Sequence, residues 1–236
     1  MSLRTMIGKA GRGVLGNDLY ARLRTARQTD DGFLRRVRGV IHVGANTGQE
    51  ARLYESFGLN VVWIEPIPEV FENLRAHIGE FSRQAAFRYL VTDEDGKEYK
   101  LRVSNNGGQS SSILDFSGHS KMWPDVQYTH SISVESVTLG TLLRRERIDL
   151  RKFDALVLDT QGAELKILRG AASLLSSFRF IKVEAPDFES YKGCCTIDEL
   201  SEFMLSRRFR EYSRVAFMQT LGVGTYFDVT YKRAWA

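Results

Sequence analysis

Gly44 and Gly48 frame a turn that could hold a nucleotide-like ligand. They belong to the segment Val-Gly-Ala-Asn-Thr-Gly (43 to 48), which follows a β-branched apolar run and precedes a helical pattern. Glycine allows backbone geometry and close ligand approach that a Cβ would forbid. We expect a helix to begin inside this turn near Gln49, where its unpaired N–H groups would face a ligand over the strand end.

Glu65 stands 21 positions after Gly44, at the end of the apolar run Val61 to Ile64. An acidic residue at the tip of the second strand of a doubly wound sheet can accept hydrogen bonds from both ribose hydroxyls of a nucleotide-like ligand. The turn lacks the third glycine of a dinucleotide fingerprint and the Gly-Lys-Ser/Thr of a P-loop. A pyrophosphate is therefore not the favoured ligand.

Two more carboxylates follow buried-type apolar runs further along the chain. Asp159 ends the run Phe153 to Leu158, and Glu184 follows Phe180 to Val183. We expect Glu65, Asp159 and Glu184 to lie at three strand tips of one sheet. Ligands of open α/β sheets bind in the crevice outside these carboxyl ends.

The elements around these residues predict an α/β fold of one main domain. Apolar runs alternate with helical patterns, which favours a doubly wound, mostly parallel, seven-stranded Rossmann-like sheet. The segments 212–218 and 225–232 flank Leu-Gly-Val-Gly and predict an antiparallel C-terminal hairpin. A further strand is expected over 87–91, and alternation around Leu101 and Ile132 predicts an antiparallel pair inserted in a crossover.

The segment 104–131 is a long loop rich in Ser, Gly and Asn. It also carries Trp123, Tyr128, His119 and His130. Loops of this length are usually lids, binding loops or disordered segments, and large aromatic residues argue against plain disorder. The aromatic residues either face a substrate or pack the loop onto the domain.

Composition and charge limit the possible domain organisation, partners and cellular location. The chain has 236 residues, and residues 1–36 read as a basic helical extension before a domain spanning 37–236. Residues 1–38 hold nine Lys or Arg and three Asp or Glu, while the whole chain carries only +4. The extension could contact nucleic acid or an anionic membrane surface weakly, although a solvated surface helix is the simpler reading. Without a secretory segment or a membrane span, we expect a cytoplasmic protein.

The cysteines and histidines predict no metal site. Cys194 and Cys195 are adjacent and supply too few ligands for zinc, and the four histidines show no metal-ligand spacing. Reduced thiols in a cytoplasm fit best.

Five motifs together resemble the FkbM-type family of class I S-adenosylmethionine-dependent methyltransferases. They are Val-Gly-Ala-Asn-Thr-Gly-Gln-Glu (43 to 50), Glu-Pro-Ile-Pro (65 to 68), Ser-Ser-Ser (110 to 112), Leu-Asp-Thr-Gln-Gly-Ala-Glu (158 to 164) and Lys-Val-Glu (182 to 184). The resemblance covers roughly residues 37–232. One departure is His42, where many such enzymes have an acidic residue; it could reach the cofactor or be satisfied by a neighbouring side chain.

The resemblance implies S-adenosyl-L-methionine as cofactor and a hydroxylated small molecule or glycan as acceptor. It implies that the glycine turn lines the methionine part, that Glu65 holds the ribose and that Asp159 lies near the transferable methyl group. The expected cofactor-binding residues are Gly44, Ala45, Asn46, Thr47, Gly48, Glu65, Pro66, Asp159 and Gln161. The candidates for the base that takes the hydroxyl proton are Asp159, Glu184 and, if the long loop folds over the site, His119 or His130.

The leading interpretation is therefore an O-methyltransferase. One alternative is a scaffold that binds the cofactor without turnover. A second is an RNA methyltransferase, which the basic extension suggests, but the near-neutral remainder and the missing Asn/Asp-Pro-Pro-Tyr type motif count against it.

Overall fold

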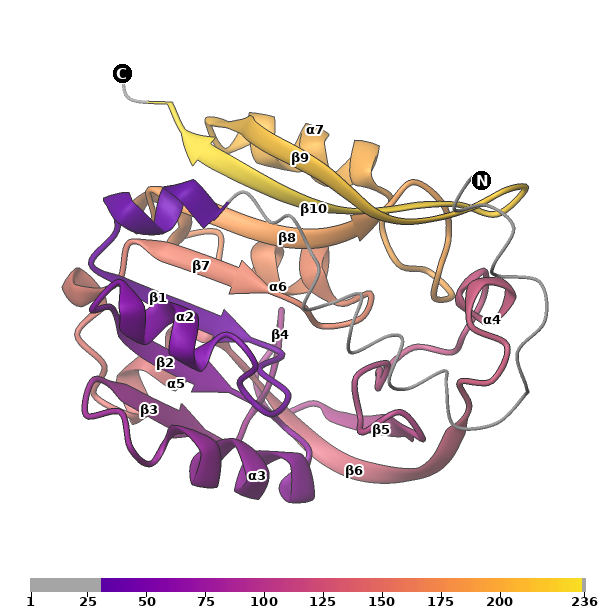
Figure 1. Cartoon of the computed structure of the whole chain (residues 1–236), viewed down its shortest axis with the longest axis horizontal. Coiled ribbons are helices and arrows are strands. Elements are labelled where there is room, and N and C mark those ends of the chain that lie inside the picture. The colour runs from indigo at the N-terminus through magenta and orange to yellow at the C-terminus, as the bar shows by residue number, and fades with distance from the viewer. Residues whose placement is uncertain (1–30, 235–236) are drawn as a thin grey trace, which may run out of the picture.

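The computed structural model describes residues 31–234 and contains a seven-stranded sheet in the order β3-β2-β1-β7-β8-β10-β9. Five neighbouring strands run parallel, and β10 pairs antiparallel with both β8 and β9. The strands are β1 (Gly39–Val43), β2 (Asn60–Ile64), β3 (Gln84–Phe87), β7 (Ala155–Leu158), β8 (Phe180–Pro186), β9 (Phe209–Thr220) and β10 (Gly224–Arg233). The predicted doubly wound sheet with a C-terminal hairpin is confirmed (Figure 1).

Helices cover both faces of this sheet, as Figure 1 shows. One face packs against η2 (Asp31–Arg36), α2 (Ala51–Ser56) and α3 (Pro68–Ile78), and the other against α5 (Leu139–Arg145), α6 (Glu164–Gly170) and α7 (Ile197–Ser206). Short 3-10 turns η3 (Leu150–Lys152) and η4 (Leu175–Ser177) precede β7 and β8. Thr138 caps α5, and Thr196 forms a capping box with Glu199 at the start of α7.

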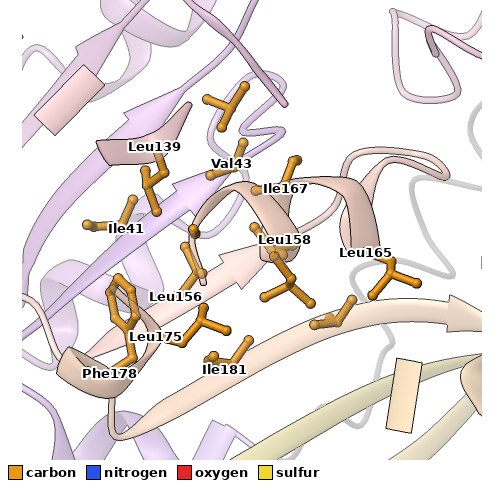
Figure 2. Close-up of a cluster of buried hydrophobic side chains, with 14 of the residues drawn as sticks. Ile41, Val43, Leu139, Leu156, Leu158, Leu165, Ile167, Leu175, Phe178 and Ile181 are labelled. Atoms are coloured by element: carbon orange, nitrogen blue, oxygen red, sulfur yellow. The ribbon is translucent and has the colours of Figure 1, made fainter. Parts of the chain in front are cut away.

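The larger core lies between β1, β7, β8 and the helices α5 and α6. Figure 2 shows Ile41, Leu156 and Ile181 directed into one cluster with Leu139 and Ile167. These side chains are all fully buried. The alternate residues of the strands, such as Val40 and Val157, pack into the core on the other face. Because both faces are covered, the strands read as nearly continuous apolar runs.

A three-stranded sheet in the order β4-β6-β5 is inserted between β3 and α5. It contains β4 (Leu90–Thr92), β5 (Glu98–Ser104) and β6 (Tyr128–Thr138), and α4 (His119–Met122) lies in the β5–β6 connection. The antiparallel β5–β6 pair is confirmed, with Leu101 opposite Ile132. The single strand expected over 87–91 is wrong, because β3 ends at Phe87 in the main sheet and β4 pairs with β6 instead.

Two further expectations about element ends differ from the structure. Helix α2 begins at Ala51, after the glycine turn rather than inside it. Strand β8 continues past Glu184 to Pro186, because β10 pairs with it as far as the partners Tyr226 and Pro186. Glu184 is therefore an internal strand residue opposite Asp228 and does not occupy a strand tip.

Most of the predicted basic extension, including residues 1–30, lies outside the described residues. Within residues 31–234, no helix is long and apolar enough to cross a membrane. Of the extension, only η2 is described, and its Phe33 and Leu34 are buried in the core beside Phe180. These two residues join η2 to the main domain.

Candidate active site

A pocket opens at the carboxyl ends of β1, β2 and β7. The chain adds β2 and β3 on one side of β1 and then β7 and β8 on its other side. This is the topological switch point at which doubly wound sheets bind ligands. Its polar wall contains Gly44, Asn46, Glu65, Pro66, Gln109, Ser111, Ser112, Asp159, Thr160 and Gln161. Its apolar wall contains Val43, Ile67, Tyr89, Leu90, Val91, Leu101, Ile113 and Ala163, and Gly108 also lines the pocket.

The turn after β1 is fixed by both neighbouring strands. Gly44 has φ +81°, and a Cβ there would lie 1.9 Å from the carbonyl oxygen of Asp159, so glycine is required. The backbone N–H groups of Gly44 and Ala45 both donate to the carbonyl oxygen of Ile64, at 3.0 and 3.1 Å. These N–H groups are committed to β2, which corrects the expectation that a helix start supplies unpaired donors at this point.

Glu65 is buried, and its carboxylate accepts hydrogen bonds from two backbone groups. The N–H of Asn46 donates to Oε2 at 2.9 Å, and the N–H of Ile67 donates to Oε1 at 3.0 Å. Burial raises the pKa of Glu65 to about 7; the two hydrogen bonds oppose this shift, and the charge of Asp159 adds to it. Glu65 thus joins the first turn to the second strand end and changes charge near neutral pH.

Asp159 follows β7 directly and lines the same pocket. Its Oδ1 accepts a hydrogen bond of 2.7 Å from Nε2 of Gln161. Gln161 lies in the left-handed region with φ +57°, an uncommon conformation for a residue with a side chain. Backbone strain of this kind is frequent at functional sites.

Glu164 stabilises the strained turn between Asp159 and α6. Its buried carboxylate accepts from the N–H of Thr160 at 2.8 Å and from the N–H of Gly162 at 3.0 Å. Desolvation raises the pKa of Glu164, and these backbone donors oppose the shift. The residue starts α6, where a carboxylate also interacts favourably with the helix dipole.

The first part of the long loop, residues 104–112, forms one wall of the pocket. Nδ2 of Asn46 donates to the carbonyl oxygen of Gly107 at 3.0 Å, and Oγ of Ser112 donates to the carbonyl oxygen of Gln161 at 2.7 Å. A buried network that includes the side chains of Asn106 and Ser110 fixes the loop conformation. The loop therefore connects the turns after β1 and β7.

The aromatic residues of the long loop pack against one another. His119 is 1% exposed, its Nε2 is 3.1 Å from Oγ of Ser110, and its ring stacks on Phe116 at a centroid distance of 4.4 Å. Burial lowers the pKa of His119 to about 4, which keeps it neutral at physiological pH. Tyr128 stacks on Phe116 and donates its hydroxyl to the carbonyl oxygen of Leu114. These contacts favour the packing interpretation for His119 and Tyr128.

Six of the predicted cofactor-binding residues line the pocket, and three do not. The lining residues are Gly44, Asn46, Glu65, Pro66, Asp159 and Gln161. Ala45 is buried in the core, the carbonyl oxygen of Thr47 contacts Nδ1 of His77 at 2.8 Å, and Gly48 has φ +72° next to Leu74. These three residues belong to the turn without lining the pocket.

Three of the four candidate bases, Glu184, His119 and His130, do not line the pocket. Glu184 is a buried residue of β8, and His130 is an exposed residue of β6 whose Nδ1 contacts the hydroxyl of Thr129. His42 is buried, its ring stacks on Trp63, and its Nδ1 lies 3.2 Å from the hydroxyl of Tyr54. This arrangement favours the interpretation of His42 as a strand residue satisfied by a neighbour.

Sequence reasoning missed most of the apolar wall. Leu90, Val91 and Leu101 come from the inserted sheet, whose position over the strand ends depends on long-range pairing with β6. The serine cluster 110–112 was a usable signal, because two of its members line the pocket. Across residues 31–234, no group of three or more His, Cys, Asp or Glu side chains could hold a metal ion.

The sequence of this chain matches a protein-family model and a curated relative. Residues 42–211 match the model of the "Methyltransferase FkbM domain". A curated relative, the 2-O-methyltransferase NoeI of Sinorhizobium fredii (strain NBRC 101917 / NGR234), is 27% identical over 182 residues, which cover 72% of this chain and 74% of that protein.

Solved structures of methyltransferases share the fold. Magnesium protoporphyrin IX methyltransferase (ChlM) from Synechocystis PCC 6803 with bound S-adenosylhomocysteine has a TM-score of 0.53 at 9% identity, covering 98% of this chain and 92% of that one. Sp1610 of Streptococcus pneumoniae, a putative tRNA (m1A22) methyltransferase in complex with S-adenosyl-L-methionine, has a TM-score of 0.50 at 10% identity, covering 92% and 73%. Because both identities are this low, the likeness concerns the fold alone.

Proposed function

Because this chain belongs to the FkbM methyltransferase family, we propose that its S-adenosylmethionine-dependent methyl transfer is directed to a hydroxyl oxygen of a carbohydrate or similar hydroxylated acceptor. Membership of this family establishes the S-adenosylmethionine-dependent methyltransferase activity. The name of the curated relative specifies transfer to an oxygen. The observation that carries the proposal is the carboxylate of Asp159 in the pocket, within electrostatic reach of Glu65.

Glu65 fits the role of the ribose acceptor. Its buried carboxylate faces the pocket, and each oxygen already accepts one backbone N–H. A carboxylate oxygen has capacity for a second donor, so hydroxyl groups of a ribose can complete its hydrogen bonding. Among residues 31–234 no basic side chain forms an ion pair with Glu65. Neutral hydroxyl donors therefore suit this site.

The apolar wall fits the base of the cofactor. Ile67, Leu90, Leu101 and Ile113 line the pocket and come from four different segments. Small-molecule sites are typically apolar with a few convergent polar groups, which fix the orientation of the ligand. Here the polar groups are those of Glu65, Asn46 and Asp159.

The residues of the chain then have to position the acceptor and remove one proton. The cofactor supplies an already activated methyl group on its sulfonium, so the reaction depends mainly on proximity and orientation. As the new O–C bond forms, the hydroxyl proton becomes acidic and a general base can accept it. Asp159 is the proposed base, and its carboxylate also favours the positively charged sulfonium. Glu184 and His130 remain secondary candidates.

Cofactor affinity is expected to rise with pH between about 6 and 8. The pKa of Glu65 is about 7, and ribose hydroxyls donate to its ionised form, so binding is stronger above this pKa than below it. Isothermal titration calorimetry with the neutral product S-adenosylhomocysteine measures this without the sulfonium charge. Glu65→Gln should remove most of the pH dependence. A wild-type affinity that is flat over this range contradicts the ribose role of Glu65.

The acceptor class is tested by radiolabelled methyl transfer. The full chain is incubated with S-adenosylmethionine and a panel of methyl glycosides that have a free 2-hydroxyl, each paired with its 2-deoxy analogue, and with total tRNA. We expect label in at least one glycoside and none in its 2-deoxy partner. The 2-deoxy pairing follows the oxygen position in the name of the curated relative.

Two other outcomes would support the alternatives. Label in tRNA alone would favour the RNA methyltransferase. Tight binding of S-adenosylhomocysteine without transfer to any acceptor, including extracted glycans, would favour a cofactor-binding scaffold.

A further inference from the structure

The backbone of Gln161 is held in place by hydrogen bonds to its carbonyl oxygen and to the peptide groups on both sides of it. Gln161 is 8% exposed, and its carbonyl oxygen accepts the hydroxyl of Ser112 at 2.7 Å. The carboxylate of Glu164 binds the N–H groups of the residues on both sides of it, Thr160 and Gly162. The left-handed backbone of Gln161 is therefore held by contacts from outside the turn.

The side chain of Gln161 connects two other residues. Its Nε2 donates to Oδ1 of Asp159 at 2.7 Å, and its Oε1 accepts the hydroxyl of Tyr191 at 2.7 Å. An ionised carboxylate can only accept hydrogen bonds, so the NH₂ group must face Asp159. The carbonyl oxygen of the side chain then faces Tyr191, whose hydroxyl must donate. One hydrogen-bonding pattern satisfies both contacts.

Tyr191 is held rigidly away from the pocket. It is 1% exposed, and it is absent from the pocket lining. Its ring packs against Phe116 and His119 at centroid distances of 5.6 and 5.3 Å. Its backbone forms an antiparallel bridge with Phe116. The position of its hydroxyl is therefore set by the long loop, which the bridge joins to the segment after β8.

We propose that Tyr191 is a positioning residue, which acts through Gln161 to orient the carboxylate of Asp159 toward the reacting atoms. The inference rests on the proposed role of Asp159 at the methyl group. Replacing the hydroxyl of Tyr191 leaves Oε1 of Gln161 buried without its donor, and the carboxamide can rotate. Asp159 then loses its fixed N–H donor for part of the time. A small displacement of a catalytic group lowers the reaction rate strongly.

Tyr191→Phe is the main test, and Tyr231→Phe is its matched control. Tyr231 is also 1% exposed, and its hydroxyl lies 2.8 Å from Oγ of Ser201 in α7. Each variant loses one buried tyrosine hydroxyl, and only the first loses a contact that leads to Asp159. Thermal unfolding first establishes that both variants are folded.

Two measurements follow, and one requires no acceptor. The first is the preference for S-adenosylmethionine over S-adenosylhomocysteine, taken as the ratio of their dissociation constants, because a well-placed carboxylate favours the sulfonium cation. We expect Tyr191→Phe to reduce this preference about threefold. The second is turnover with an acceptor from the glycoside panel, where we expect kcat to fall about tenfold and the acceptor KM to stay nearly constant. Tyr231→Phe should change neither.

A double-mutant cycle tests the route through Gln161. If Tyr191 acts only through this carboxamide, Tyr191→Phe has no further effect on the cofactor preference in a Gln161→Leu background. Additive effects would overturn the route, and equal behaviour of Tyr191→Phe and Tyr231→Phe would overturn the positioning role. If Asp159→Asn changes neither measurement, the proposed role of Asp159 is wrong. If Asp159→Asn changes both but Tyr191→Phe changes neither, only the positioning role of Tyr191 is wrong.

Discussion

Asp159→Asn is expected to lower turnover by about 10²-fold or more, while the affinity for S-adenosylhomocysteine, which lacks the sulfonium charge, is largely kept. Asparagine has nearly the same shape as aspartate, so the backbone contact between Asp159 and the Gly44 turn should remain. The substitution removes the charge and replaces one acceptor oxygen by an NH₂ group. That group cannot take a proton from the acceptor hydroxyl. A loss concentrated in the chemical step is the signature of a general base.

Single-turnover rates at saturating S-adenosylmethionine separate chemistry from binding in this experiment. The comparison is made across pH for wild type and variant, because only the wild-type rate should depend on the ionisation of Asp159. A purely cofactor-binding role predicts the reverse, with weaker affinity and a nearly normal rate once the cofactor is saturating. An undiminished single-turnover rate would exclude Asp159 as the base and direct attention to Glu184 and His130.

The parts of this protein that were predictable from sequence are those set by local pattern. The apolar runs that form β1, β2, β7 and β8 are buried on both faces, so their composition alone indicates a parallel sheet. Glu65 and Asp159 follow two of these runs directly. Because parallel strands of one sheet end at the same edge, their convergence on the pocket follows from strand order.

The parts that were not predictable depend on contacts between distant segments. Glu184 looks like a strand end in the sequence, but the antiparallel partner β10 extends β8 to Pro186. The contact between Gln161 and Tyr191 joins residues 30 positions apart, and Tyr191 belongs to no motif. The inserted sheet similarly depends on β6 pairing with both β4 and β5, so the strand expected over 87–91 is split.

Removing the carboxylate of Glu65 should have the largest effect on cofactor binding. Glu65→Ala is expected to weaken S-adenosylhomocysteine binding by about 1.5 to 3 kcal/mol, the range for hydrogen bonds to a charged group. That corresponds to a roughly 10- to 150-fold higher dissociation constant. Calorimetry at pH 8, where wild-type Glu65 is mostly ionised, gives the clearest comparison. An unchanged affinity would show that Glu65 does not accept the ribose hydroxyls.

The fold should survive this substitution, because two effects on stability oppose each other. The N–H groups of Asn46 and Ile67 lose their acceptor, but a carboxylate that burial disfavours is also removed. The folded-state pKa of about 7 is above the ordinary value of 4.5, so the stabilising contribution of Glu65 is complete below about pH 4.5 and is lost as pH rises through 7. Thermal unfolding should therefore show Glu65→Ala more destabilised relative to wild type at pH 5 than at pH 8. The opposite order would mean that the folded protein stabilises the ionised form of Glu65. That result would contradict the raised pKa of this buried carboxylate.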